Sequence, residues 1–171
     1  MDVREEIRRA LADMGIAFDE AVHEEVHTIG ECRAIGEKLN AVVPKNLFLT
    51  PRNQSAFYLC LVRPNALFRT ADVSKQIGSS RLSFGSEEML SQLLRTHGGA
   101  VSPLGLLFDG EKKVRVLIDR TLLALPRLGF HPNDNTRTIA MAGDDFFHIF
   151  LPRLGRTATC VDLPDAQAGG T

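Results

Sequence analysis

The stretch from residue 97 to residue 106, HGGAVSPLGL, has residue types from which a ligand-binding loop can be built. It contains three glycines, a serine and a proline, and it follows a segment, 86–96, with helical spacing. Glycine lets another molecule approach the backbone closely, and exposed backbone N–H groups can hold a carbonyl or phosphate oxygen. The alternative is purely structural, because Gly98 after His97 is also a common way to end a helix.

The sequence does not support a covalent nucleophile. Ser102 precedes Pro103, and its surroundings do not match the G-x-S-x-G turn that exposes a catalytic serine. The three cysteines are widely spaced and form no CxxC pair, which argues against both a disulfide framework and a metal site. We therefore predict that Cys32, Cys60 and Cys160 are buried thiols in a reducing compartment.

Two polar residues stand out because of their apolar neighbours. Lys45 opens a predicted strand, 45–49, where a lysine is uncommon unless it is paired or reaches a cavity. The alternative for Lys45 is an edge lysine whose charge reaches solvent. His131 lies between Phe130 and Pro132, and the alternative for it is a surface or capping group in a turn.

One cluster, His23, Glu24, Glu25 and His27, contains side chains that bind metal ions. Two histidines four residues apart bind zinc convincingly when they share one face of a helix. This cluster falls between a predicted strand and a predicted helix start, so we expect a loop without a metal. Nothing in the sequence indicates a cofactor.

Composition and charge indicate one ordinary globular domain. The 171 residues include 44% hydrophobic and 24% charged residues, and the net charge is −1. We expect a single domain over 1–164 with a flexible tail over 165–171. No run is long and apolar enough for a membrane span, and the first residues lack a signal-peptide pattern, so we expect a cytoplasmic protein. A nucleic-acid partner would need a local basic patch, for which the candidates are Arg63, Arg69, Lys75 and Arg81.

Hydrophobic periodicity and capping residues predict an α+β fold around a mixed, largely antiparallel sheet. Capping boxes open the first two helices, and turn residues separate two predicted hairpins, 45–62 and 106–119. A short helix is expected within 122–128, followed by a turn-rich loop over 129–133. The predicted helices cover 2–14, 28–39, 71–77, 86–96 and 144–154, and the other strands cover 16–22, 138–142 and 157–161.

Three segments together resemble the YbaK/ProX family. They are 44–49 (PKNLFL), 99–105 (GAVSPLG) and 129–136 (GFHPNDNT), and the resemblance extends over residues 1–163. Members of this family are free-standing editing domains that deacylate mischarged tRNA, similar to the insertion domain of bacterial prolyl-tRNA synthetases. The resemblance implies a curved sheet flanked by helices.

The resemblance also implies roles for residues of these segments. Lys45 would contact the phosphate or ribose at the tRNA end, and the 99–105 loop would line the aminoacyl site. A ribose hydroxyl of the substrate would assist the attacking water, so that no protein nucleophile is needed. On this basis the catalytic candidates are Lys45, Gly99, Ala100, Ser102 and Gly105, and the substrate-binding candidates are Asn46, Val101, Pro103, Leu104, His131 and Asn133.

Among family members, the sequence most resembles those that remove alanine from proline tRNA. The implied partners are alanine-mischarged proline tRNA and a prolyl-tRNA synthetase. Three alternatives remain open: removal of cysteine instead of alanine, a non-catalytic tRNA- or nucleotide-binding module with the same pocket, and a synthetase partner that acts by surface contact.

Overall fold

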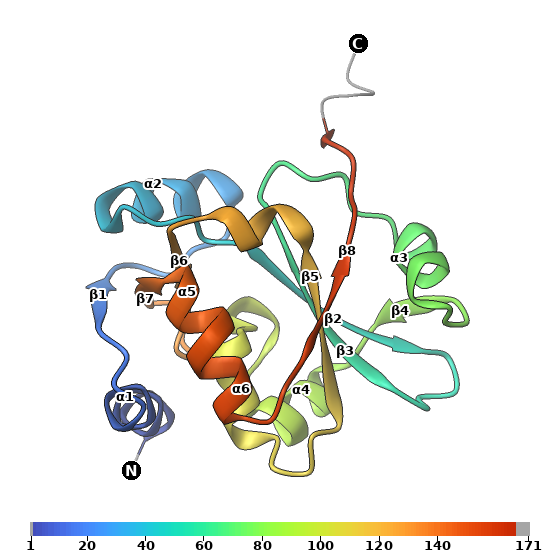
Figure 1. Cartoon of the computed structure of the whole chain (residues 1–171), viewed down its shortest axis with the longest axis horizontal. Coiled ribbons are helices and arrows are strands. Elements are labelled where there is room, and N and C mark those ends of the chain that lie inside the picture. The colour runs from blue at the N-terminus through green and yellow to red at the C-terminus, as the bar shows by residue number, and fades with distance from the viewer. Residues whose placement is uncertain (1, 167–171) are drawn as a thin grey trace.

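The computed structural model describes residues 2–166, which form two sheets covered by helices (Figure 1). A five-stranded sheet has the order β4-β2-β3-β5-β8, and a three-stranded sheet has the order β1-β7-β6. In the large sheet the strands are β2 Lys45–Pro51, β3 Phe57–Val62, β4 Leu82–Phe84, β5 Val114–Asp119 and β8 Ala158–Val161. The small sheet contains β1 Phe18–Val22, β6 Arg127–Phe130 and β7 Arg137–Ala142.

The helices lie around both sheets (Figure 1). Each of the first two ends where the sequence allows a positive φ, at Gly15 after α1 and at Asn40 after α2. The helices are α1 Val3–Asp13, α2 Ile29–Leu39, α3 Thr70–Ile77 and α4 Glu87–Leu94; the short 3₁₀ segments are η1 Gly98–Ala100, η2 Pro103–Phe108 and η3 Arg120–Ala124; and the last helix joins α5 Gly143–Asp145, the π-helical η4 Phe146–Phe150 and α6 Leu151–Arg153.

The predicted fold class is confirmed, with strands that pair mostly antiparallel. Within the large sheet β2 pairs antiparallel with β3 and β4, whereas β5 lies parallel to both β3 and β8. The small sheet is antiparallel throughout. The single sheet of the prediction is divided in two, and the two parts meet at a parallel bridge between Val42 and Leu128.

The predicted hairpin over 106–119 is wrong. Ser102 accepts a hydrogen bond from the Leu104 amide and Pro103 starts η2, so the apolar run that we took for a strand winds into a 3₁₀ helix. The second strand, β5, then pairs with β3 in parallel instead of folding back. The predicted loop at 129–133 also begins too early, because Arg127–Phe130 is strand β6.

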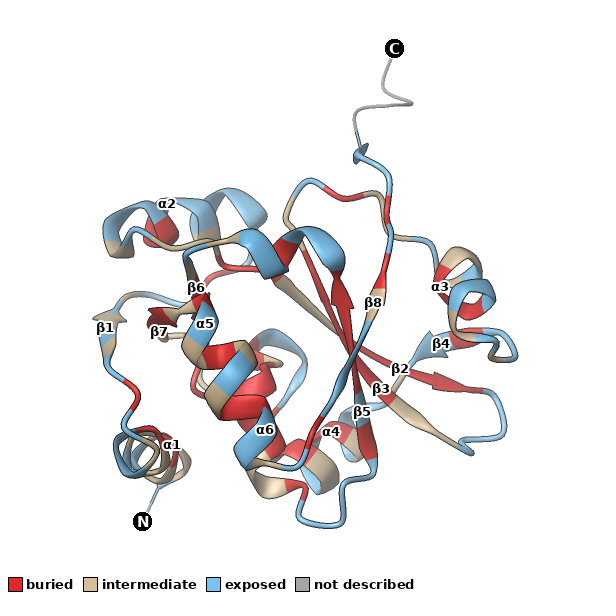
Figure 2. Ribbon diagram, viewed as in Figure 1, coloured by how far each residue is buried: buried red, intermediate tan, exposed pale blue. Residues whose placement is uncertain are grey.

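The central strands β3 and β5 of the large sheet are buried on both faces, as the continuous apolar run of β3 requires, whereas the edge strands β4 and β8 are partly exposed (Figure 2). Leu59 and Leu61 belong to the core formed with α1, α4, η2 and the small sheet. Tyr58, Cys60 and Val62 alternate with them and pack on the opposite face, under α3. This alternation fixes the strand register, since a shift of one residue would exchange the two cores.

The C-terminal end of the described chain is attached to the large sheet. Asp165 forms an ion pair with Arg63 at 2.9 Å, and the Ala166 amide donates to the Asn65 carbonyl at 2.8 Å. These two residues belong to the stretch that we predicted to be a flexible tail. The remainder of that stretch, 167–171, lies outside the described residues.

A buried ion pair closes the connection between η2 and β5. Arg156 and Asp109 have side chains that are 5% and 2% exposed, and their charged atoms lie 3.1 Å apart. The guanidinium also donates to the Asp109 carbonyl at 2.7 Å, while the Asp109 carboxylate accepts from the amides of Lys113 and Val114. The pair therefore satisfies backbone groups as well as its own charges.

We predict that Arg156→Leu destabilises the protein by about 3–5 kcal/mol, because it leaves the Asp109 carboxylate buried without its counter-charge. Arg153 is the last residue of α6 and is exposed, so Arg153→Leu should change the free energy of unfolding by less than about 0.5 kcal/mol. Urea unfolding of both variants measures the difference. Equal stabilities would mean that the ion pair does not hold this connection.

Candidate active site

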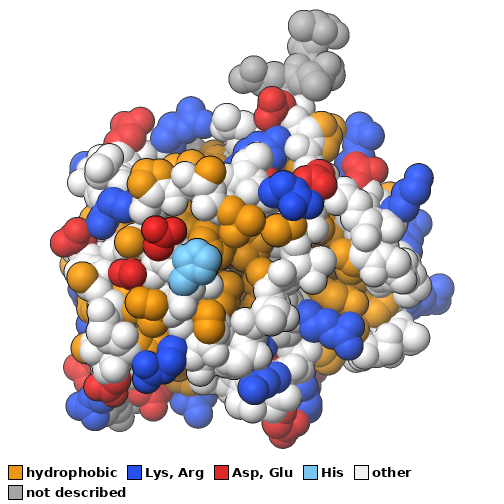
Figure 3. Space-filling model, in the orientation of Figure 1, with side chains coloured by type: hydrophobic (Ala, Val, Ile, Leu, Met, Phe, Trp, Pro, Cys, Tyr) orange, Lys and Arg blue, Asp and Glu red, His pale blue; other side chains and the backbone are white. Residues whose placement is uncertain are grey.

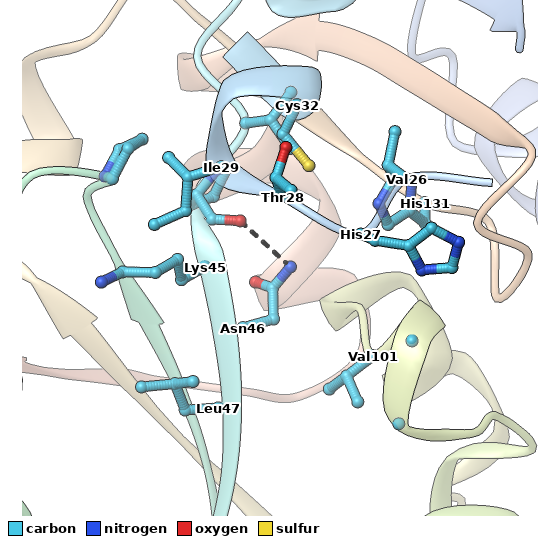
Figure 4. A pocket seen from close by; sticks show the side chains of 15 residues that line it. Val26, His27, Thr28, Ile29, Cys32, Lys45, Asn46, Leu47, Val101 and His131 are labelled. Atoms are coloured by element: carbon cyan, nitrogen blue, oxygen red, sulfur yellow. Dashed lines mark hydrogen bonds between the residues drawn. The ribbon is translucent and has the colours of Figure 1, made fainter. Parts of the chain in front are cut away.

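An open pocket of about 490 Å³ lies where the two sheets meet. Its walls come from the first turn of α2, the start of β2, the loop before η2 and the residue after β6 (Figure 4). The volume suits a small ligand together with part of a larger one. The lining residues are Val26, His27, Thr28, Ile29, Cys32, Val43, Pro44, Lys45, Asn46, Leu47, Pro64, Gly98, Gly99, Val101 and His131.

Lys45 is the cation of this pocket. It is the first residue of β2, opposite Val62, and its Nζ donates to the Ala66 carbonyl at 3.4 Å. Burial lowers the pKa of Lys45, and within residues 2–166 no carboxylate forms an ion pair with it. Of the alternatives that the sequence left open for Lys45, the structure has the one in which the residue lines a cavity. A partly dehydrated ammonium of this kind favours a ligand that brings a negative charge or strong acceptor oxygens.

Asn46 also lines the pocket and has an unsatisfied acceptor. Its Nδ2 makes a long contact of 3.5 Å to the Pro44 carbonyl, shown as the dashed line in Figure 4. Its Oδ1 is buried and accepts no hydrogen bond from the part of the chain that is described. Since buried carbonyl oxygens are normally hydrogen-bonded, this atom can receive a ligand N–H or O–H.

The loop from His97 to Val101 offers few free backbone donors. The Gly98 amide donates to both carboxylate oxygens of Glu87, at 3.0 and 3.1 Å, and the Ala100 amide donates to the His97 carbonyl. The amides of Gly99 and Val101 have no acceptor within residues 2–166, and both residues line the pocket. They are therefore the backbone groups of this loop that can bind a ligand oxygen.

Most of the predicted 99–105 segment lies outside this pocket. Ala100, Ser102, Pro103, Leu104 and Gly105 are buried and do not line the pocket. Their placement in the site, which the family resemblance implied, is not what the structure has, because η2 turns this part of the segment into the core beside α4. Gly105 is needed for space instead, since a Cβ there would lie 2.9 Å from the Leu94 carbonyl oxygen, and its φ is not positive.

His131 lines the pocket with a ring that is nearly buried, at 7% exposure. Its Nδ1 lies 2.8 Å from the Arg137 carbonyl, which can only accept, so Nδ1 carries the proton. Burial lowers the pKa of His131, and the hydrogen bond to Arg137 opposes that shift. The ring is therefore neutral at pH 7, with Nε2 left as an acceptor.

Asn133 has a structural role rather than a place in this pocket. It adopts a positive φ of 58° and donates through Nδ2 to the Leu94 and Arg95 carbonyls, at 2.8 and 3.1 Å. These carbonyls end α4, so Asn133 acts as a cap for that helix. The predicted site thus keeps Lys45, Asn46, Gly99, Val101 and His131 together and loses the other candidates.

The remaining polar candidates are separated by the fold. His23 bonds to the Glu24 carbonyl and to Thr138, whereas His27 lies at the pocket, and residues 2–166 contain no group of three ligand side chains that could hold a metal ion. Cys60 is buried as predicted, but Cys32 is half-buried and lines the pocket. Burial raises the pKa of the Cys32 thiol, so it is a small apolar wall and a poor nucleophile.

The four basic residues that the sequence offered as a patch differ in whether their charge is already compensated. Arg63 binds Asp119 at 2.8 Å as well as Asp165, so its charge is already compensated. Arg69, Lys75 and Arg81 are exposed and form no ion pair within the described range. Figure 3 shows basic and acidic side chains interspersed on one face.

None of the helices in residues 2–166 is long and apolar enough to cross a membrane.

Sequence reasoning missed the wall that α2 contributes. A capping box, in which Thr28 accepts from the Glu31 amide at 3.1 Å and donates back to its carboxylate, sets the first turn against the pocket. In the structure Ile29 is 47% exposed although it is apolar, which shows that it faces the pocket and not the core. Its spacing from Cys32 brings both side chains to the same helix face.

The fold and this pocket define an α+β domain whose site uses backbone amides, one lysine and one neutral histidine. A model of the aminoacyl-tRNA editing domain matches residues 23–149. The chain therefore belongs to the aminoacyl-tRNA editing domain family, of the YbaK/ProX type.

Individual relatives agree with this assignment. The chain is 31% identical over 163 residues to the prolyl-tRNA editing protein ProX of Acetoanaerobium sticklandii, covering 95% of this chain and 99% of that protein. It is 31% identical over 147 residues to the prolyl-tRNA synthetase associated domain-containing protein 1 of Danio rerio, covering 85% and 79%. A solved structure described as a candidate trans-editing enzyme for prolyl tRNA synthetase has the same fold, with a TM-score of 0.71 at 17% identity over 96% of this chain and 98% of that one.

We predict that Ser102→Ala lowers stability by about 0.5–2 kcal/mol, because it removes the cap of η2, and leaves ester hydrolysis within about twofold of wild type. Ser91→Ala, at an exposed position of α4, is the matched control and should change neither property. Thermal unfolding and initial rates measure both effects. Detection of an acyl group on Ser102 by mass spectrometry would contradict the structural role.

Proposed function

We propose that this protein is a trans-editing deacylase that hydrolyses alanine from mischarged proline tRNA. The observation that carries the proposal is the convergence of two free backbone amides, Gly99 and Val101, with Lys45 and the unsatisfied Asn46 oxygen in one small pocket. Family membership supports aminoacyl-tRNA editing, and the names of the relatives from Acetoanaerobium sticklandii and Danio rerio support the prolyl system. A prolyl-tRNA synthetase is the matching partner.

In the proposed mechanism the protein supplies geometry and electrostatics instead of a nucleophile. The Gly99 and Val101 amides hold the ester carbonyl oxygen and stabilise the negative charge that develops on it. Lys45, whose ammonium group is partly removed from water, binds the phosphate or ribose of the terminal nucleotide. The neighbouring ribose hydroxyl of the substrate then positions or activates the attacking water.

Selection among amino acids follows from the walls of the pocket. Ile29 and Cys32 are apolar and lie beside Lys45 and Asn46 (Figure 4). Val43 is a further apolar residue that lines the pocket. A synthetase pocket made for proline rejects the smaller alanine by only about 1–3 kcal/mol, since it loses only apolar contacts. A second pocket that admits alanine and has no room for the proline ring supplies the missing discrimination.

Rival functions differ in measurable ways. A cysteinyl-tRNA deacylase would use the same groups with a wall that accepts a thiol. A non-catalytic tRNA-binding module would bind the aminoacyl end and leave the ester intact. Membership of the aminoacyl-tRNA editing family favours an enzyme, and the two free amides suit it because they can stabilise the charge that develops on an ester carbonyl oxygen.

The experiment uses purified protein and proline tRNA charged separately with alanine, cysteine and proline. We expect alanine to be released at least about 10-fold faster than either of the others, which corresponds to more than about 1.4 kcal/mol of discrimination. A preference for cysteine would replace the alanine assignment. Binding without release of any amino acid would exclude a deacylase.

We predict that Lys45→Ala lowers kcat/KM for alanyl-tRNA about 10-fold or more, because one charge-assisted contact contributes about 1.5–3 kcal/mol. Lys113→Ala, in the exposed turn before β5, should behave like wild type. Circular dichroism establishes that both variants fold, and initial deacylation rates give the comparison. A wild-type rate for Lys45→Ala would remove the lysine from the mechanism.

A further inference from the structure

Three polar side chains on one face of the small sheet form a chain that ends in the pocket. Thr138 of β7 is fully buried, and it lies between His131, which follows β6, and His23, which follows β1. The register explains the grouping, because β6 pairs Phe130 with Ile139 and β1 pairs Ala21 with Thr138. Extension of these registers by one or two residues sets His131 opposite Thr138 and His23 diagonal to it.

When both histidine rings are neutral, the contacts among His23, Thr138 and His131 allow one arrangement of protons. His23 Nδ1 lies 2.7 Å from the Glu24 carbonyl, so it carries the proton and its Nε2 is an acceptor. The Thr138 hydroxyl lies 2.8 Å from that Nε2 and must donate to it. Its oxygen, 3.3 Å from His131 Nδ1, can then only accept from that ring.

We propose that Thr138 and His23 are positioning residues for His131, and this inference rests on the proposed deacylase function. With the Arg137 carbonyl and Thr138 both accepting from Nδ1–H, the ring is held in one tautomer with its Nε2 lone pair directed at the pocket. Nε2 accepts a hydrogen bond either from the α-ammonium group of the aminoacyl ester or from the water molecule that attacks it. His23 acts indirectly, because its Nε2 accepts the only proton of the Thr138 hydroxyl and leaves the hydroxyl oxygen to accept from His131.

The first test reads the tautomer without any substrate. In wild-type protein at neutral pH, ¹⁵N NMR of the imidazole rings should give His131 as the neutral form protonated on Nδ1. Thr138→Val keeps the shape of the side chain and removes the hydroxyl, so it should shift the His131 ring signals, whereas Thr138→Ser should restore the wild-type signature. A wild-type His131 protonated on Nε2 would overturn the proposal even if deacylation is confirmed.

The second test uses deacylation of alanyl-tRNA. Thr138→Val should lower kcat/KM roughly 3- to 10-fold, as expected for one lost hydrogen bond, and Thr138→Ser should recover most of the rate. Because the effect acts through His131, Thr138→Val should cost nothing further in a His131→Asn background. An equal loss in that background would mean that Thr138 acts only through the fold, and Thr159→Val on the exposed strand β8 is the control for the substitution type.

His23→Phe completes the argument because it removes the acceptor for the Thr138 hydroxyl. Its effect on kcat/KM and that of Thr138→Val should be non-additive, so that the double variant is no slower than the slower single variant. Independent, multiplying losses would exclude the chain of contacts. If no variant and no wild-type protein releases an amino acid, the proposed function fails while the NMR result still decides the arrangement of protons.

Discussion

The pocket exists because one short segment passes from the small sheet to the large one. The Val42 amide donates to the Arg127 carbonyl at 3.1 Å and the Gly129 amide donates to the Val42 carbonyl at 2.8 Å, and β2 begins three residues later. This places Lys45 and Asn46 beside the end of β6, where His131 follows. A Cβ on Gly129 would lie 3.0 Å from Val43 and 3.2 Å from Thr138, so a larger residue there would push against both side chains.

The site depends on backbone groups whose neighbours are already satisfied. Glu87 accepts a hydrogen bond from the Gly98 amide, and Ser102 accepts one from the Leu104 amide. These two backbone donors are therefore already used within the fold. The Gly99 and Val101 amides are left over by this arrangement. The anchoring of the loop therefore determines where these two amides can bind a ligand oxygen. The charge of Lys45 attracts the same ligand but does not determine its orientation.

Local sequence signals predicted much of this structure, and non-local pairing explains what they missed. The capping residues Asp2, Thr28 and Ser86 each accept the expected backbone hydrogen bond, and the apolar run of β3 is buried on both faces. The hairpin prediction at 106–119 was wrong because the first apolar run belongs to the 3₁₀ helix that Ser102 and Pro103 begin, and because the parallel pairing of β5 with β3 is a non-local contact. In the site, Lys45 and His131 were recognisable as polar residues in apolar surroundings, whereas Ser102 and Asn133 looked functional and serve as caps.

The meeting of the two sheets also bears on how the protein folds. The residues of the pocket range from Val26 to His131, and Val42 pairs with Leu128 although strands β2, β3, β4 and β5 lie between them in the sequence. Contacts of such long sequence separation close late and slowly, because loop-closure entropy must be overcome first. A partly folded chain with its helices formed would contain no pocket, so ligand binding by a nascent or refolding chain is a measure of the final step of folding.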